Sequence, residues 1–221
     1  MAKQTKKQQQ NLNSLTSGIA TLGLDIGYGV VKVVTDEQAF AFPSVMGHAR
    51  EIKFQQDFIQ QKYAGDTIHD DEGDWFVGDL ALAQLPPGEL LRLRGRTANE
   101  KTMGNAFRLR LAKAAIGKLA KGVWGRDVIH LRLAAGLPVD HMRDAQQLKE
   151  SLLGQHIIET DSCEIIANIT EVIVMPQPYG ALYSQMLTPS GGINVHHTYM
   201  RIGIVDVGTY TIDIALDDDG E

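Results

Sequence analysis

Residues 22–34, with the sequence LGLDIGYGVVKVV, decide the fold of this 221-residue chain. Two apolar runs flank the Gly-Tyr-Gly of residues 27–29, and this pattern predicts two β-strands joined by a tight turn. Asp25 stands at the end of the first run, two residues before Gly27. A single turn of this kind is most often an ordinary hairpin, so its meaning depends on a second example.

Residues 202–216, IGIVDVGTYTIDIAL, repeat this layout near the other end of the chain. Here too an aspartate, Asp206, ends an apolar run, and a glycine, Gly208, follows two residues later. Glycine lets the backbone approach a ligand closely, and turns of this kind can direct amide N–H groups toward an anion. We therefore interpret the two hairpins as an internal duplication and expect their turns to face each other around phosphate groups.

Two aspartates and a lysine supply the charges of this expected site. Mg²⁺ keeps much of its water in proteins and is held by one or two carboxylates beside phosphate oxygens. Asp25 and Asp206 are therefore the expected magnesium residues. Lys32 has two interpretations, since its side chain can neutralise phosphate charge or extend into solvent.

The sequence between the hairpins predicts alternating strands and helices. A third strand at residues 39–45 continues the first meander, and residues 46–91 form an irregular segment that we interpret as an inserted subdomain. A capping-box pattern at residues 97–100 begins a helix with one apolar face. That face comprises Phe107, Leu111, Ala114, Ala115 and Leu119. Further strands and helices up to residue 186 predict a mixed α/β sheet.

Composition excludes several classes of protein. The net charge of −6 provides no overall basic surface for nucleic acid. Ten of the 21 Lys and Arg residues do lie between Arg92 and Arg126, and we interpret them as a solvated helix face, with contact to nucleic acid or another subunit as the alternative. Cys163 is the single cysteine and cannot form an internal disulfide, and no apolar run reaches the roughly 18 residues that cross a membrane. We expect a cytoplasmic protein without membrane contact.

A third motif, VIVMPQPYGALYSQM at residues 172–186, completes a resemblance to the superfamily of actin, sugar kinases and heat-shock chaperone ATPases. It is similar to the strand and connecting helix that join the two halves of those proteins. The resemblance is nearest to the ParM/StbA plasmid-segregation actins and archaeal actin-like proteins. Three features carry this closer resemblance. They are the Gly-Tyr-Gly turn followed by Lys32, the strand WFVGDLAL at residues 75–82, and Ala-Gly-Leu-Pro at residues 135–138 after a hydrophobic strand.

The resemblance implies an actin-like, ribonuclease-H-like α/β fold. We expect a mixed five-stranded sheet with flanking helices, a small inserted subdomain at about residues 46–91, and the first hairpin of a second lobe. Residues 1–18 would be a disordered tail, residues 19–198 the first lobe and residues 199–221 the start of the second. Because the superfamily normally continues through an adenosine-binding segment, we expect a fragment, a truncated product or half of a split protein.

The resemblance also implies ATP and Mg²⁺ as ligands. Gln177, Asp25 and Asp206 would be the catalytic residues, with Gln177 orienting the attacking water; alternatively, Gln177 only begins a helix. The phosphate-binding residues would be Gly27, Tyr28, Gly29, Lys32, Gly208, Thr209, Tyr210 and Thr211. A neutral glutamine is a poor base, so hydrolysis is expected to be slow.

Three functions follow from this resemblance. The leading one is slow hydrolysis of ATP to ADP and phosphate, expected when the complete second lobe is supplied, and coupled to the assembly of copies of this chain into filaments for plasmid or DNA segregation. A DNA-binding adaptor protein would be a second partner. The alternative is a non-catalytic interaction module that retains a truncated actin-like fold. A small-molecule kinase is disfavoured, because the first turn is not a Gly-Gly-Thr turn followed by an acidic sugar-binding loop.

Overall fold

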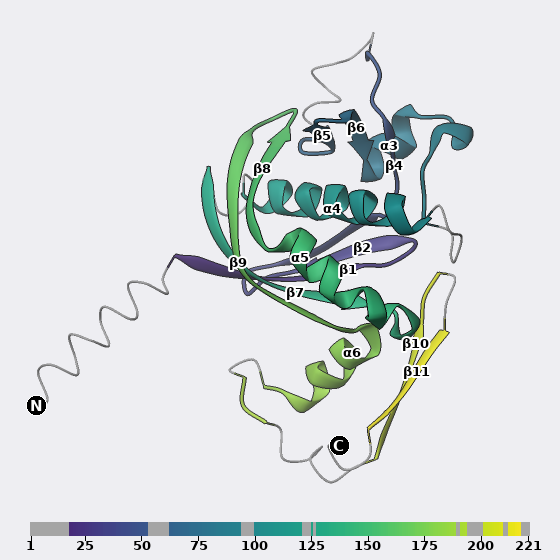
Figure 1. Cartoon of the computed structure of the whole chain (residues 1–221), viewed down its shortest axis with the longest axis vertical. Coiled ribbons are helices and arrows are strands. Elements are labelled where there is room, and N and C mark those ends of the chain that lie inside the picture. Colours follow the sequence, from purple (N-terminus) through teal and green to yellow (C-terminus); the bar gives the residue numbers. More distant parts are fainter. Residues whose placement is uncertain are drawn as a thin grey trace, which may run out of the picture.

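The structure is a computed structural model (Figure 1). Its strands form a nine-stranded sheet and a separate two-stranded hairpin. It describes residues 18–52, 62–93, 100–120, 125, 127–188, 191–193, 201–209 and 212–217. The strand order in the large sheet is β3-β2-β1-β7-β9-β8-β5-β6-β4. Its strands are β1 (Ile19–Ile26), β2 (Val30–Val34), β3 (Ala39–Pro43), β4 (Met46–His48), β5 (Thr67–Asp70), β6 (Gly73–Val77), β7 (Val128–Leu137), β8 (Gly154–Thr160) and β9 (Glu164–Pro176). The expected tail lies outside the described residues, except for Gly18.

Three parallel strands, β1, β7 and β9, form the centre of this sheet. Parallel neighbours need crossover connections, and the helices α4 (Glu100–Leu119) and α5 (Ala145–Leu152) lie in those connections. Along β7 the side chains alternate between buried and more exposed positions, because alternate residues of the strand point into the main hydrophobic core. The carboxyl ends of the three strands meet at one edge of the sheet, where ligands commonly bind in α/β folds.

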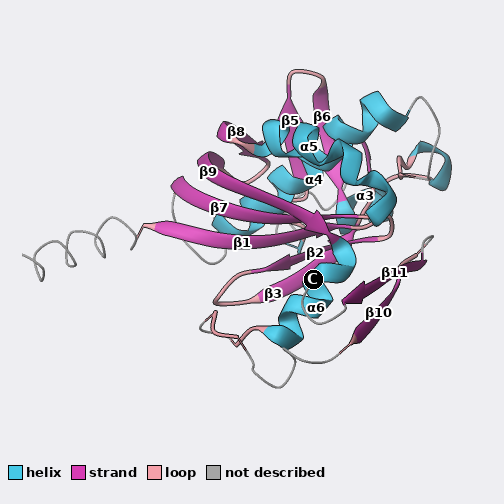
Figure 2. Cartoon of the chain, turned by 60° about the horizontal axis from the view of Figure 1, so that its bottom comes forward, coloured by secondary structure: helices cyan, strands magenta, loops and turns pink. Residues whose placement is uncertain are grey.

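Helices α4 and α5 lie on the same face of the sheet (Figure 2). The apolar face predicted for the first helix is buried at all five positions, Phe107, Leu111, Ala114, Ala115 and Leu119. Leu148 and Leu152 of α5 join the same core. The capping-box residues before Glu100 lie outside the described residues. A third helix, α6 (Gln177–Met186), follows β9 directly.

The sheet is larger than the five strands expected. Beyond β3, β2, β1, β7 and β9, the sheet continues through β8, which pairs with β9, and then through β5, β6 and β4. The segment at residues 46–91 therefore extends the main sheet, while Phe76 and Leu80 belong to a small core of their own. This segment also contains the helix α3 (Gly78–Gln84) and the 3-10 helix η1 (Pro87–Glu89). Strands of three to five residues are too short to show a clear period-2 pattern, so this sequence seemed irregular.

A buried arginine joins the β5–β6 hairpin to α4. Arg110 is 5% exposed and donates hydrogen bonds to both carboxylate oxygens of Asp70, at 2.6 and 3.3 Å, and to Glu72 at 2.6 Å. Its guanidinium carbon lies 3.9 Å from the centre of the Trp75 ring. Burial alone would raise the pKa of Asp70, but hydrogen bonds from Arg110, the Glu72 backbone and Trp75 hold it below its ordinary value.

A second cation of α4 also points inward. Lys118 forms an ion pair with Asp66, which is 2% exposed, and burial raises the pKa of Asp66 although Lys118 opposes this shift. The interpretation of the basic stretch as a solvated helix face is therefore wrong for Arg110 and Lys118. These two cations fasten the inserted segment to the helix.

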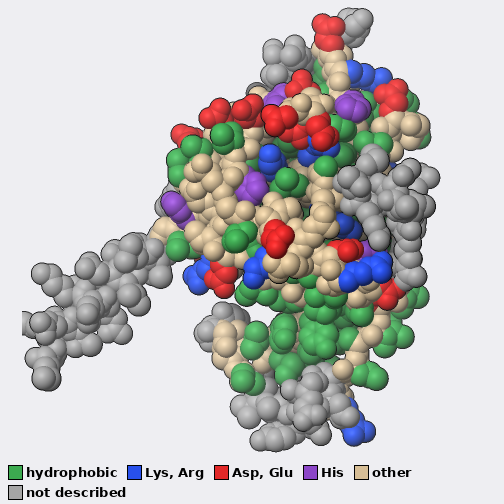
Figure 3. Space-filling model, viewed as in Figure 1, with side chains coloured by type: hydrophobic (Ala, Val, Ile, Leu, Met, Phe, Trp, Pro, Cys, Tyr) green, Lys and Arg blue, Asp and Glu red, His purple; other side chains and the backbone are tan. Residues whose placement is uncertain are grey.

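The hairpin of β10 (Ile202–Val207) and β11 (Ile212–Asp217) forms the separate two-stranded sheet. It packs against α6, and its other face carries apolar side chains that are 63–77% exposed (Figure 3). These are Val205, Val207, Ile212, Ile214 and Leu216. Among the described residues, no helix is both long and apolar enough to cross a membrane.

Candidate functional site

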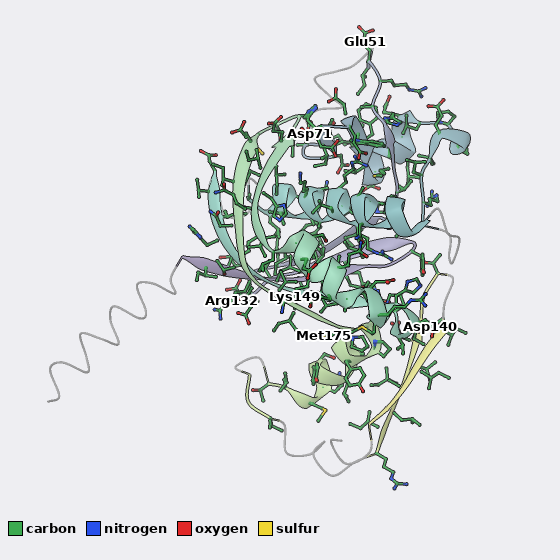
Figure 4. All side chains as sticks on the ribbon, viewed as in Figure 1. Glu51, Asp71, Arg132, Asp140, Lys149 and Met175 are labelled. Atoms are coloured by element: carbon green, nitrogen blue, oxygen red, sulfur yellow. The ribbon has the colours of Figure 1, made fainter. Side chains whose placement is uncertain are left out.

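The carboxyl ends of the parallel strands bring Asp25, Gly136 and Met175 into one row. Asp25 of β1 lies opposite Gly136 of β7, which in turn lies opposite Met175 of β9. Gln177, two residues beyond Met175, is the first residue of α6. Figure 4 shows Met175 at this junction of β9 and α6. The fold thus brings Gln177 to the strand edge beside Asp25.

A short hydrogen bond joins Gln177 to Asp25. Nε2 of Gln177 lies 2.5 Å from Oδ1 of Asp25. An ionised carboxylate only accepts hydrogen bonds, so the amide must turn its NH₂ group toward Asp25. The amide oxygen then lies on the other arm of the planar group, where it can accept a hydrogen bond from water. This arrangement suits a residue that orients a water molecule.

Gly136 makes the approach of Gln177 possible. A Cβ atom at position 136 would stand 3.0 Å from Cγ of Gln177 and 3.7 Å from Oδ1 of Asp25. The Ala-Gly-Leu-Pro stretch contributed to the resemblance, but Gly136 itself was not among the predicted site residues. The signal was present, because a glycine inside an apolar strand often marks a place where another group comes close.

Lys32 lies opposite Asp25 in the antiparallel register of β1 and β2. Its Nζ is 3.2 Å from Oδ2 of Asp25, and its side chain is 67% exposed. The ammonium of Lys32 thus contacts the Asp25 carboxylate, while most of its side chain faces solvent. Exposed ion pairs of this kind contribute little to stability, about 0–1 kcal/mol.

Hydrogen bonds already hold much of the first turn. The N–H of Gly27 donates to the carbonyl of Val30 at 3.1 Å, and the N–H of Ser44 donates to the carbonyl of Gly29 at 2.9 Å. The hydroxyl of Tyr28 lies 3.2 Å from Nε2 of His141, in the 3-10 helix η3 (Val139–Asp144). These contacts hold the first turn in place.

The two hairpin turns touch each other, as expected. A Cβ atom built at Gly29 in the first turn would collide with the side chain of Thr209 in the second. Gly208 and Thr209 are exposed at the end of β10. Tyr210 and Thr211 lie outside the described residues.

Two aspartates lie directly across from each other in the second hairpin. Asp206 of β10 pairs in register with Asp213 of β11, and both are half-buried. Like charges at directly opposed positions destabilise a strand pair, unless a cation lies nearby. The second hairpin thus carries a concentrated negative charge beside its turn.

Both turns line one cavity of about 300 Å³. It receives Asp25, Gly27, Tyr28, Gly29 and Lys32 from the first hairpin and Asp206, Gly208 and Thr209 from the second, together with Gln177, Pro138 and Arg108. A second, largely apolar cavity of about 730 Å³ shares Asp25, Lys32, Gln177 and Asp206 with it and continues between the sheet and α6. All described residues predicted for the site therefore come together, and Arg108 of α4 is an additional member that the sequence did not single out.

Asp25 and Asp206 provide the two carboxylates expected for Mg²⁺. Within the described parts of the chain, no group of three or more His, Cys, Asp or Glu side chains could hold a metal by themselves. Mg²⁺ needs no such cage, because waters and phosphate oxygens complete its coordination. Two carboxylates that border one cavity with a glutamine amide are a donor set that fits this ion.

Residues 23–180 match the family model described as the N-terminal domain of actin-like proteins. A comparison with curated proteins found no significant match. The part of the chain that matches the family model thus contains the first hairpin, the parallel strands and the start of α6.

Solved structures of actin-like proteins share the fold. The apo structure of the pSK41 ParM protein has a TM-score of 0.73 at 20% identity, over 92% of this chain and 63% of that one. A 15-stranded ParM filament from Clostridium botulinum matches with a TM-score of 0.64 at 22% identity, over 91% of this chain and 60% of that one. Bacillus thuringiensis ParM with AMPPNP matches with a TM-score of 0.62 at 19% identity, over 92% of this chain and 58% of that one. The chain thus spans about three fifths of the length of the structures it resembles.

Proposed function

Because this chain belongs to the family of actin-like proteins, we propose that it binds ATP with Mg²⁺ between its two hairpin turns and couples slow hydrolysis to filament assembly in plasmid or DNA segregation. The observation that carries the proposal is the shared cavity of the two turns. Segments about 180 residues apart in sequence place two aspartates, glycine backbone and a glutamine amide around one cavity, beside the apolar residues Ile26, Val30, Leu93 and Val207. The polar groups are the ones that a phosphate chain with Mg²⁺ would contact.

Gln177 has the role of orienting water in this proposal. Its NH₂ group is held by Asp25, so its carbonyl oxygen can accept a hydrogen bond from a water molecule that attacks the terminal phosphate. A neutral amide takes up a proton poorly, so it positions the water without removing its proton. Hydrolysis would then be slow, as in other nucleotide switches that orient water with a glutamine.

Asp25 and Asp206 are the residues that would hold Mg²⁺, through its bound waters. When bound, the ion would neutralise phosphate charge. Lys32 would balance the charge of Asp25 and remain able to reach an outer phosphate oxygen from its exposed position. The exposed backbone at Gly208 and Thr209 would approach the phosphates from the second hairpin.

Relatives support the nucleotide and filament parts of the proposal. Structures similar to this chain include Bacillus thuringiensis ParM with ADP and with AMPPNP, and a ParM filament from Clostridium botulinum. By analogy, copies of this chain would assemble with one another, in the cytoplasm, and a DNA-binding adaptor would connect the filament to its cargo. The exposed apolar face of the β10–β11 hairpin is a surface that assembly could cover.

The second candidate is a non-catalytic interaction module. It is supported by the apolar side chains that the β10–β11 hairpin exposes, because a partner protein could cover them without any nucleotide. Sedimentation of the chain with and without Mg-ATP distinguishes the two. ATP-dependent polymer supports the filament proposal. Polymer formed equally without nucleotide, or none under either condition, favours the interaction module.

A further inference from the structure

One arginine reaches the phosphate cavity from the helix layer. Arg108 lies on α4, and its half-buried side chain lines the cavity together with Gln177 and both turns. It belongs to the basic stretch that the sequence suggested was a solvated helix face. Its position instead adds a cation to a space otherwise bordered by two aspartates and Lys32.

The glycine one turn earlier in α4 fits the position of this side chain. A Cβ atom at Gly104 would stand 3.3 Å from Nη1 of Arg108. Long side chains in helices lean toward the N-terminus and cover the preceding turn. A glycine in a helix interior is unfavourable compared with alanine, so its presence is explained if the guanidinium needs this room.

Arg108 and Arg110 face different parts of the molecule. Residues two apart on a helix point in nearly opposite directions. Arg110 donates hydrogen bonds to Asp70 and Glu72 of the inserted hairpin, and Arg108 lines the cavity. Helix α4 thus connects the cavity with the β5–β6 hairpin through two neighbouring arginines.

The charges of the cavity indicate what Arg108 would bind. Lys32 already contacts Asp25, and Asp206 adds a further negative charge. A triphosphate carries several negative charges and would be repelled by these carboxylates without opposing cations. A guanidinium is well suited to this task, because its planar N–H groups can bind two phosphate oxygens at once.

We propose that Arg108 binds the terminal phosphate of the nucleoside triphosphate. This inference rests on the proposed function, since it assigns a ligand contact inside the same site. The terminal phosphate is indicated because Gln177, which would orient the attacking water, borders the same cavity. Arg108 would then contact the triphosphate but not the diphosphate. Because Arg108 belongs to α4, this helix would carry the contact that differs between the two nucleotides.

Calorimetric titration of the chain with Mg-AMPPNP and with Mg-ADP tests this assignment. Arg108→Gln should weaken AMPPNP binding by about tenfold or more and change ADP binding less than about twofold. Arg108→Lys, which keeps the charge but loses the planar fork, should fall between wild type and Arg108→Gln. The matched control is Arg132→Gln, an exposed arginine of β7 that lies away from the cavity (Figure 4).

Gly104→Ala provides an independent variant that should not impair folding. Alanine favours the helix, and its Cβ would move Nη1 of Arg108 by a few tenths of an ångström, so we expect a smaller loss of AMPPNP affinity than in Arg108→Gln while thermal stability is retained. Unchanged AMPPNP affinity in Arg108→Gln, or an equal loss of affinity for both nucleotides, would overturn the role of Arg108 but leave the proposed function standing. Wild-type protein that binds neither nucleotide would overturn the proposed function and this assignment with it.

Discussion

Nε2 of Gln177 lies 2.5 Å from Oδ1 of Asp25, although the two residues are 152 positions apart in the chain. The parallel pairing of β1, β7 and β9 produces this contact, because the ends of all three strands lie at one edge of the sheet. The carboxylate fixes which way the amide faces. The proposed water-orienting role thus depends on the fold as well as on the glutamine.

Replacing Gln177 should separate binding from hydrolysis. In Gln177→Ala we expect phosphate release from Mg-ATP to fall at least about tenfold, because no amide remains to orient water. ATP affinity should change less than about twofold. The matched control is Gln185→Ala, an exposed glutamine of the same helix. Equal hydrolysis rates in wild type and Gln177→Ala would show that this residue only begins α6.

A side chain at position 136 should disturb the contact between Gln177 and Asp25. Gly136→Val would press against Cγ of Gln177, which lies 3.0 Å from the Cβ position, and we expect a loss of about 1–3 kcal/mol in stability together with slower hydrolysis. Gly180→Ala on α6 is the control, since nothing lies within 4 Å of its Cβ position. Retention of full hydrolysis in Gly136→Val would contradict the requirement for a glycine here.

The contact between the two turns can be tested by a pair of substitutions. Gly29→Ala should weaken Mg-ATP binding, because its methyl group collides with Thr209. Combining it with Thr209→Gly should restore part of the loss. We expect a coupling of at least about 0.5 kcal/mol in a double-mutant cycle. Strictly additive effects of the two substitutions would mean that the turns do not meet in solution.

The Arg110–Asp70 pair predicts a pH-dependent contribution to stability. The pKa of Asp70 is lowered from its ordinary 3.8, so the ionised carboxylate stabilises the fold above about pH 4, and this contribution disappears as the pH falls through the lowered pKa. Asp70→Asn should therefore cost about 2–4 kcal/mol at pH 7, because it leaves the buried Arg110 with only the exposed Glu72. The difference from wild type should shrink toward pH 2.

Urea unfolding at several pH values measures this effect. Asp71→Asn is the control, since Asp71 is the exposed neighbour of Asp70 at the tip of the hairpin (Figure 4). A difference between wild type and Asp70→Asn that stays constant from pH 7 to pH 2 would contradict the ion pair as its source.

Sequence patterns predicted the parts of the fold that depend on local chemistry. The glycine turns, the apolar face of α4 and the start of α6 at Gln177 all follow from spacing within about 20 residues. The meeting of Asp25 with Gln177 was expected only through family resemblance, because no local pattern sets the distance between two strand ends. Even so, the family-level expectation named both residues.

Other features depend on packing that no short pattern reveals. Strands β4, β5 and β6 are three to five residues long, so the sheet's extension was missed. Arg108 and Arg110 belong to a basic stretch whose surface or interior position depends on which face of α4 each occupies. Gly136 could have been recognised from its place inside an apolar strand, but its partner could be found only in three dimensions.

The most direct test of the central claim is calorimetric titration of this chain with ATP, with and without Mg²⁺, in wild type and Asp206→Ala. Asp206 is chosen because it belongs to the second hairpin and borders the cavity shared with the first. We predict saturable, Mg²⁺-dependent binding to wild type that Asp206→Ala weakens at least about tenfold. Absence of binding to wild type, or equal affinity in Asp206→Ala, would contradict a phosphate site built from the two turns.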